Sequence, residues 1–385
     1  MKSPFTVSQI VDPVDLLRIG RQWNRLCGET PNQNAAHRGR WDLSLPWTLG
    51  WISELPESQR DLVVLTASSG TSLRGILPLV MHSTPAGREL RLVGSVGCLG
   101  DSKGILATGD DQEAIGEAFG NYLASEWLGQ VPSLHLQSVA QEDPGIRSFV
   151  EALVSRSGWN AETRPEPTQR MVLRPAQGPD GEPIWPLSCR RAIALVKKSL
   201  ESGMFKLTGA SEDTDRMQVA KHAMMIRGML KNDAPELQEP FGSIPMSQRL
   251  LDYRFSKGVS RNLSQVGCLG SCLVEWKGTP IAGALFVDFG SSRSVVWSEV
   301  RVHPDQEPLV AWMLLSQLLR TAIQSGLREL QLGLALGRYA IAMGNKAPSL
   351  WSISVGPAES ETEGNSVDTL ETANTASTAN TANDE

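Results

Sequence analysis

The chain has 385 residues, of which 41% are hydrophobic and 20% are charged, and its formal net charge is −6. Its length exceeds what one ordinary hydrophobic core supports, so two domains are expected. The sequence contains no apolar run near the roughly 20 residues of a membrane-spanning helix. The N-terminus also lacks the apolar segment of a signal peptide. We therefore expect a cytoplasmic protein without a membrane span.

The charge is unevenly distributed along the chain. Residues 357–385 contain seven carboxylates and no Lys or Arg, so the remainder carries a net charge of +1. A nearly neutral body lacks the basic surface that nucleic-acid binding requires, which argues against a nucleic-acid partner. The same segment repeats Thr-Ala-Asn and contains few apolar residues, and this composition predicts a disordered acidic tail.

Residues 1–165 predict an α/β unit with a mixed sheet. Segments with helical spacing of apolar residues follow aliphatic runs that are joined by short turns. Helices are expected at Val14–Leu26, Pro46–Leu55, Gln112–Trp127 and Gly145–Ser157. Strands are expected at Leu62–Ala67, Leu73–Met81, Leu90–Val96 and Ser133–Ser138.

A second unit is expected over residues 188–356, after a linker rich in Pro and Gly at residues 166–187. Its helices are expected at Cys189–Ser202, Asp213–Lys231 and Ile244–Lys257, and its first strands at Met204–Leu207, Ser271–Trp276 and Thr279–Phe289. Both halves repeat a strand–strand–helix–strand order, which suggests two related domains.

The end of the second unit contains the most informative segment. It reads as a strand at Ser294–Val302, a helix at Pro308–Ser325 and a strand at Leu327–Leu334. Two short strands around a helix imply a crossover between parallel strands. Pro308 suits the first helical turn, and Gly326 suits a left-handed cap at the helix end. Such a unit can bind an extended acyl carrier beside the strand and phosphates at the helix start.

Cysteines and histidines give no sign of a metal site. The five cysteines include no Cys-x-x-Cys pair, and the five histidines are scattered along the chain. A structural or catalytic zinc site needs three or four such ligands at characteristic spacing. We therefore expect no metal.

Several segments in order resemble a known family. They are LRGILPLVMH, LRLVGSVGCLGDSKGILA, RRAIALVKKSLESGMFKL, KHAMMIRGML, GTPIAGALFVDF, VHPDQEPLVAWMLL and LRELQLGLALGRYA. Together, over residues 10–355, they resemble the CelD/BcsL-type acetyltransferases associated with cellulose biosynthesis. This is a branch of the GNAT superfamily close to the FemAB-like tandem-domain proteins. The resemblance implies an α/β fold with two tandem GNAT-like domains.

The resemblance also implies an activity and a donor site. It implies transfer of an acyl group from acyl-CoA, as cosubstrate, to an amine or hydroxyl of a small sugar or a polysaccharide or cell-envelope precursor. The donor would lie along Ser294–Val302 and Asp305–Trp312. The residues expected to contact CoA are Val300, Val302, Leu309 and Val310. Asp101, His222 and Arg227 match family positions and are expected to bind the acceptor. The oligomeric state is left open.

Two side chains near this donor site could perform the chemistry of acyl transfer. The reaction needs a base for the amine proton and a donor for the leaving thiolate. Glu299 lies in the strand Ser294–Val302, where alternation puts it on one face with Trp297 and Arg301. It is the candidate base, and an ion pair with Arg301 is the alternative interpretation. Tyr339 follows the last strand and is the candidate acid, with a packing role as its alternative.

Two departures from the family pattern keep other functions open. Glu307-Pro308-Leu309 stands where the family commonly has Ser-Pro-Gly, and Ala340 follows Tyr339 where the family often has Lys. Carboxylates at the helix start would repel a pyrophosphate, although they also complement the helix dipole. A non-catalytic GNAT-fold interaction module is therefore one alternative. A FemAB-like aminoacyl transferase is the other, and the nearly neutral body argues against it.

Overall fold

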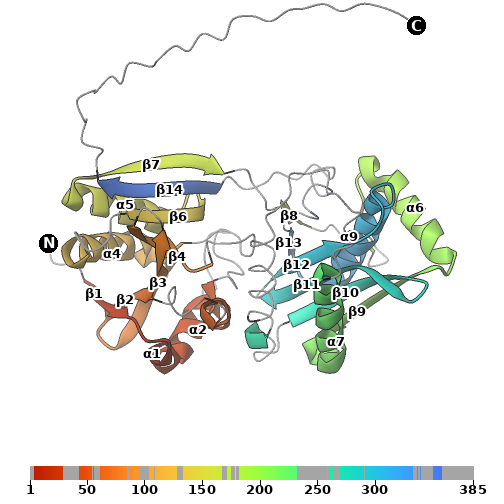
Figure 1. Ribbon diagram of the computed structural model, residues 1–385, viewed down its shortest axis with the longest axis horizontal. Coiled ribbons are helices and arrows are strands. Elements are labelled where there is room, and N and C mark those ends of the chain that lie inside the picture. The colour runs from red at the N-terminus through yellow and green to blue at the C-terminus, as the bar shows by residue number, and fades with distance from the viewer. Residues whose placement is uncertain are drawn as a thin grey trace, which may run out of the picture.

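The protein folds into two mixed α/β units, each built on one sheet (Figure 1). The structure is a computed structural model. It describes residues 4–28, 43–53, 55, 61–84, 87–94, 104–107, 109–127, 133–166, 171–174, 178, 182–231, 258, 261–263, 269–289, 291–332, 336, 339 and 350–357.

The first unit contains an eight-stranded sheet. Its strands are β1 (Thr6–Ile10), β2 (Leu62–Ser69), β3 (Ser72–Thr84), β4 (Gly87–Leu92), β5 (Leu106–Ala107), β6 (Ser133–Ala140), β7 (Trp159–Glu166) and β14 (Leu350–Pro357). Their order is β1-β2-β3-β4-β6-β14-β7, with β5 paired to β3. Within the described strands, β4 and β6 pair in parallel and the other pairs are antiparallel.

The described α-helices of this unit are α1 (Pro13–Arg18), α2 (Gly20–Gly28), α3 (Leu45–Ser53), α4 (Gln112–Glu126) and α5 (Pro144–Ser157). Glycines let α4 and α5 approach closely. A Cβ atom at Gly116 would lie 2.1 Å from the carbonyl oxygen of Gly145, and one at Gly120 would lie 2.3 Å from that of Phe149. Both contacts are with backbone, so neither position accepts a side chain without moving a helix.

The second unit contains a six-stranded sheet. Its strands are β8 (Met171–Leu173), β9 (Phe205–Ser211), β10 (Leu269–Trp276), β11 (Thr279–Phe289), β12 (Ser292–Val300) and β13 (Glu329–Leu332). Their order is β8-β13-β12-β11-β10-β9, and within the described strands only β12 and β13 pair in parallel. Helices α6 (Arg190–Glu201) and α9 (Glu307–Gln324) cover one face, and α7 (Glu212–Lys231) covers the other (Figure 1).

The crossover expected at the end of the second unit is present: β12, α9 and β13 follow one another, and the two strands are parallel. The expected helices and strands of the first unit also form, within a few residues of the expected ends, except that the single helix expected at Val14–Leu26 is divided into α1 and α2 at Ile19. The sequence did not predict β1, β5, β7, β8 or β14. The helix expected at Ile244–Lys257 lies outside the described residues.

Two strands depart from the expected division of the chain. β8 lies inside the expected linker and pairs with β13 of the second sheet. β14 follows the second unit in sequence, yet it lies in the first sheet between β6 and β7 (Figure 1). The chain therefore returns to its first unit before the acidic tail begins. The boundary at residues 166–187 stays a prediction. The two pairings show that β8, inside this segment, belongs to the second sheet and that β14, after the second unit, belongs to the first.

One apolar cluster contains residues from both units. In the first unit it includes the fully buried Trp23 and Trp47, and in the second it includes Val219, Val287 and Val296. The tryptophans of α2 and α3 are thus core residues, which is the packing role that amphipathic helices usually give them. A continuous apolar cluster of this kind couples the two units energetically.

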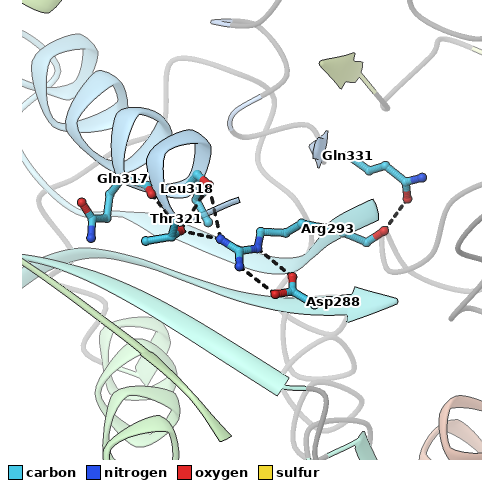
Figure 2. Close-up of polar contacts among 7 residues, drawn as sticks. Asp288, Arg293, Gln317, Leu318, Thr321 and Gln331 are labelled. Carbon is cyan, nitrogen blue, oxygen red and sulfur yellow. Dashed lines mark hydrogen bonds and ion pairs between the residues drawn. The ribbon is translucent and has the colours of Figure 1, made fainter. Parts of the chain in front are cut away.

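A buried ion pair joins the β11–β12 hairpin to α9 (Figure 2). The side chain of Arg293 is 2% exposed, and its Nε and Nη2 atoms donate to the two carboxylate oxygens of Asp288, each at 2.7 Å. Nη1 donates to the hydroxyl of Thr321 and to the carbonyl oxygen of Leu318 in α9. The guanidinium carbon also lies 3.8 Å from the ring centroid of Phe286. Every polar edge of this buried cation therefore has a partner.

Breaking this pair should destabilise the protein strongly. Asp288→Ala leaves the Arg293 charge buried without its carboxylate, and the expected loss is about 3 kcal/mol of unfolding free energy, at the lower end of such cases because Asp288 is partly exposed. Asp61→Ala is the matched control, since the Asp61–Arg88 pair is more than half exposed and worth less than about 1 kcal/mol. Urea unfolding of both variants measures the difference. Equal losses would contradict a special role for Arg293.

Truncation separates the tail from the last strand. Pro357 still pairs with Trp159, so removal of residues 358–385 should leave the melting temperature within about 2 °C of the full chain. Removal of residues 350–385 also deletes β14 and leaves β6 and β7 without their shared neighbour, so it should unfold the first sheet. Circular dichroism melts of the two truncated chains test this. Similar melting temperatures would show that β14 contributes little.

Candidate functional site

The parallel pair in the second sheet is short and then separates. β12 pairs with β13 only at Ser292–Ser294, opposite Glu329–Gln331, although β12 continues to Val300. Within the described residues, no strand pairs with the β13 side of β12 from Val295 onward. An unpaired strand edge offers N–H and C=O groups to an extended ligand. We call this edge the splayed edge.

Polar contacts fasten the closed end of the splay. The hydroxyl of Ser294 donates to the Oε1 atom of Gln331, and that of Ser292 lies 3.4 Å from the Oε2 atom of Glu329. Arg293 lies between these two serines and binds α9 through Thr321. The separation of the strands therefore begins at a fixed residue.

Four of the expected donor-site residues pack against one apolar cluster. Val300, Val302, Leu309 and Tyr339 are partly buried and pack against the same apolar cluster of the second unit. The expected contact residue Val310 is 1% exposed and lies within the cluster. We call the part of this cluster beside the splayed edge the apolar floor. The Val310 side chain is part of it, so only the Val310 backbone could contact a ligand.

The start of α9 is acidic and carries an aromatic group. The Tyr339 hydroxyl donates to the Oε1 atom of Glu307 at 3.4 Å, and the Tyr339 ring packs edge-on against Trp312 at 6.1 Å between centroids. Asp305, whose side chain is 88% exposed, lies 3.2 Å from the Nδ1 atom of His303. Tyr339 thus has a packing contact and a carboxylate partner. Neither Glu307 as that partner nor Trp185, which packs on Trp312, was found from the sequence.

Glu299 lies on the opposite face of the same strand. Its partner across the ladder is Gly283, where a Cβ atom would meet Ile226 of α7, so this row of residues faces α7. The Nε atom of Arg301 lies 3.4 Å from the Oε1 atom of Glu299, and both side chains are about one-fifth exposed, at 21% and 23%. The alternative interpretation, an ion pair, is therefore present. Glu299 lies one residue before the end of β12.

His222 is a buried histidine with two hydrogen-bonding partners. Its Nδ1 atom lies 2.9 Å from the Ser271 hydroxyl on β10, and its Nε2 atom lies 2.6 Å from the Gln218 side chain. Burial lowers the pKa of His222 below its usual value, although Glu275 opposes this shift. His222 and Glu299 thus lie on the same face of the second sheet. His222 is 1% exposed, so direct contact with an acceptor would require movement.

The remaining expected acceptor residues cannot be placed with their side chains. Asp101 lies outside the described residues. Arg227 lies on α7, and only its backbone is described. The acceptor positions are therefore represented in the described structure by His222 alone.

Two features lie apart from the splayed edge. A cavity of about 80 Å³ lies between α6 and α9, with Trp185, Ile193 and Leu207 among its apolar lining and Lys197 and Gln317 among its polar lining. Burial raises the pKa of the Cys272 thiol to about 12. A thiol of that pKa stays protonated near neutral pH, so Cys272 is not a nucleophile. Among the described helices, none has the length and apolar character to cross a membrane.

Comparisons with solved structures identify the fold. FemX aligns with 91% of this chain and 96% of its own, at 10% identity and a TM-score of 0.55. The C-terminal domain of an Agrobacterium fabrum protein assigned as a lysylphosphatidylglycerol synthetase aligns over 89% and 93%, at 8% identity and 0.51. A tandem GNAT protein from the clavulanic acid biosynthesis pathway aligns over 92% and 100%, at 13% identity and 0.48. No family model matches the sequence, and no curated protein is similar to it in sequence.

The fold class expected from the sequence is confirmed. The first two likenesses cover both units, so the chain has the tandem GNAT-like α/β fold. At these identities the likeness concerns the fold only.

The buried histidine gives a pH prediction. Because the pKa of His222 is lowered in the folded state, the unfolded chain binds its proton more readily. The stability that neutral His222 contributes is therefore present above the ordinary pKa of 6.5 and is lost as the pH falls below it. His222→Asn should lose less stability than the unmodified chain between neutral pH and mildly acidic pH. Urea unfolding across this range measures the loss.

His303→Asn is the matched control, since the His303 side chain is 68% exposed. It should keep the pH dependence of the unmodified chain. His82, whose pKa burial also lowers, should preserve part of the dependence in the His222 variant. An unchanged pH dependence in His222→Asn would contradict the assignment of a buried neutral imidazole.

Proposed function

We propose that this protein is an acyltransferase. In this proposal it moves an acyl group from acyl-CoA to an amine or hydroxyl of a small sugar or a polysaccharide or cell-envelope precursor, as the resemblance to CelD/BcsL-type proteins implies. The observation that carries the proposal is the splayed edge of β12, which leaves backbone hydrogen-bonding groups beside an apolar floor. A pantetheine arm is an extended chain with amide groups, and it suits such an edge.

The chemistry follows from the residues near this edge. The acceptor nitrogen or oxygen attacks the thioester carbonyl, a bond from carbon to the acceptor forms, and the carbon–sulfur bond breaks. Glu299 would take the acceptor proton directly or through a water, and its ion pair with Arg301 keeps a carboxylate in place for that role. The departing thiolate needs a proton, and Tyr339 is the proposed donor. After the transfer Glu299 would hold the acceptor's proton and Tyr339 would be a phenolate, and proton exchange with water would restore both groups.

The start of α9 favours a second candidate function. Glu307 lies in the first turn, where a donor pyrophosphate would be expected, and it already accepts the Tyr339 hydroxyl. The negative charge of Glu307 would repel a pyrophosphate bound at the start of α9, which disfavours donor binding. A GNAT-fold interaction module binds no donor, so a carboxylate at the start of α9 would not impair its function. Donor binding therefore distinguishes the two candidates.

The donor experiment uses acetyl-CoA as the probe. A specific ligand at a concentration of 100 times its Kd stabilises a protein by about 2.7 kcal/mol, so acetyl-CoA should raise the melting temperature measurably. Glu299→Gln should bind acetyl-CoA as the unmodified chain does, because it keeps size and hydrogen bonding. Its release of free CoA thiol with a panel of amines and amino sugars should fall by roughly 10² to 10⁴.

Glu275→Gln is the matched control, a second partly buried carboxylate on the same sheet that lies on β10, away from the splayed edge. It should keep both binding and turnover. Absence of acetyl-CoA binding would reject the acyltransferase and favour the interaction module. Binding with equal turnover in Glu299→Gln would keep the donor site and reject Glu299 as the base.

A further inference from the structure

Two exposed leucines lie on α6 and on the turn that leads into it, outside the described core. Leu187 and Leu195 are 77% and 52% exposed, whereas Ile193 and Val196 of the same helix are buried against the α9 side of the sheet. At about 100° per residue, Leu195 lies about 160° from Ile193 and about 100° from Val196 around the helix, so it faces away from the buried side. Leu187 belongs to a short 3-10 turn that leads into α6. The two leucines therefore have no role in the described core.

Cations alternate with these leucines. Arg191 lies four residues before Leu195, and Lys198 lies three residues after it, so these three side chains follow one side of the helix. Arg191 is also four residues from Leu187 in the preceding turn. The helix also carries Arg190 and Lys197, against a single carboxylate at Glu201. Within the part of the chain that the structure describes, none of these four cations forms an ion pair.

The same kind of surface continues past the end of α6. Met204 is 45% exposed and accepts a hydrogen bond from the Lys277 amide at 2.8 Å, which places it beside the β10–β11 turn. Trp276, the last residue of β10, is 43% exposed, and the Lys277 ammonium lies 4.8 Å from the centroid of its ring. Figure 1 shows α6 and this turn together at one edge of the molecule. We call the exposed apolar side chains and the cations of this region the α6 surface. Its members are Leu187, Arg190, Arg191, Leu195, Lys197, Lys198, Met204, Trp276 and Lys277.

We propose that the α6 surface docks on an anionic phospholipid bilayer. Residues 187–206 and 276–278 contain six Lys or Arg and one carboxylate, in a chain whose net charge is −6. Such a local excess complements anionic headgroups. Leucine, methionine and tryptophan side chains that project between cations are typical of surfaces that enter the headgroup region, where Lys and Arg remain at the phosphates.

The acidic tail of the chain fits this surface less well. Its seven carboxylates would complement the cations, but residues 357–385 contain only two large aliphatic side chains, Val367 and Leu370. It therefore cannot cover four projecting apolar groups. A bilayer matches both the charge and the apolar character of the surface.

Vesicle co-sedimentation tests the proposal with the full chain. Vesicles of phosphatidylcholine and phosphatidylglycerol in equal parts should bind the protein, and vesicles of phosphatidylcholine alone should not. Added salt should weaken the binding, since exposed charges are screened. Arg191→Gln with Lys198→Gln should lower affinity about 25-fold, or about fivefold for each cation. Leu187→Ser with Leu195→Ser should lower it at least about tenfold.

The matched control is Val14→Ser with Leu17→Ser on α1. These side chains are 60% and 61% exposed, so the substitutions remove similar apolar area elsewhere. The control should bind vesicles as the unmodified chain does. Removal of residues 358–385 should keep or strengthen binding, because it removes negative charge from the protein.

Three results would overturn the proposal. They are absence of binding to the anionic vesicles, equal binding by the leucine variant and the unmodified chain, and an equal loss in the α1 control. Binding to a peptide of residues 358–385 in place of the vesicles would assign the surface to the tail instead. All these measurements are independent of acyl transfer, so they stand apart from the test of the proposed function.

Discussion

The Arg293–Asp288 ion pair fixes the place where the second sheet divides. Asp288 and Arg293 are partners across the β11–β12 ladder, and Arg293 also belongs to the only three-residue stretch in which the described β12 and β13 pair. The same guanidinium binds the hydroxyl of Thr321 in α9. One side chain therefore joins the hairpin, the helix and the closed end of the splay. A buried cation with a forked geometry suits this role, because it makes several directed bonds at once.

Beyond this fixed point the two faces of β12 serve different neighbours. Val300 packs with the α9 side, whereas Trp297 packs with α7. The ladder with β11 shifts register between Leu285 and Phe286, which puts an irregularity into β12 near Val296. Such irregularities bend a strand and change its twist. Because side chains alternate along a strand, the candidate base Glu299 faces α7 and Val300 faces the apolar floor. The splayed edge of β12 lies between these two faces.

Strand exchange makes the two units depend on each other. β8 precedes the other strands of the second sheet in sequence and pairs with β13. β14 follows the second unit in sequence and pairs with β6 and β7 of the first sheet. The shared apolar cluster, with Trp23 and Val219 among its members, adds a direct contact. Long-range pairing of this kind raises contact order and slows folding. It also means that a separately expressed half would lack a strand that its sheet requires.

Local sequence patterns determined the elements of this protein, and the tertiary structure decided their partners. The spacing of apolar residues predicted α4, α5, α9 and the β12–α9–β13 crossover, because amphipathic periodicity is a property of a single segment. The predicted crossover also assigned Val300, Val302, Leu309 and Tyr339 to one site, and in the structure all four pack against the apolar cluster of the second unit. It did not reveal that β14 pairs with β6 and β7, since polar residues such as Ser352 and Ser354 give that strand only a weak pattern. Nor did it reveal the Ser271 contact of His222 or the Glu307 contact of Tyr339, because the partners lie 49 and 32 residues away. Hydrogen bonds over such separations leave no local periodicity, so only the folded chain determines them.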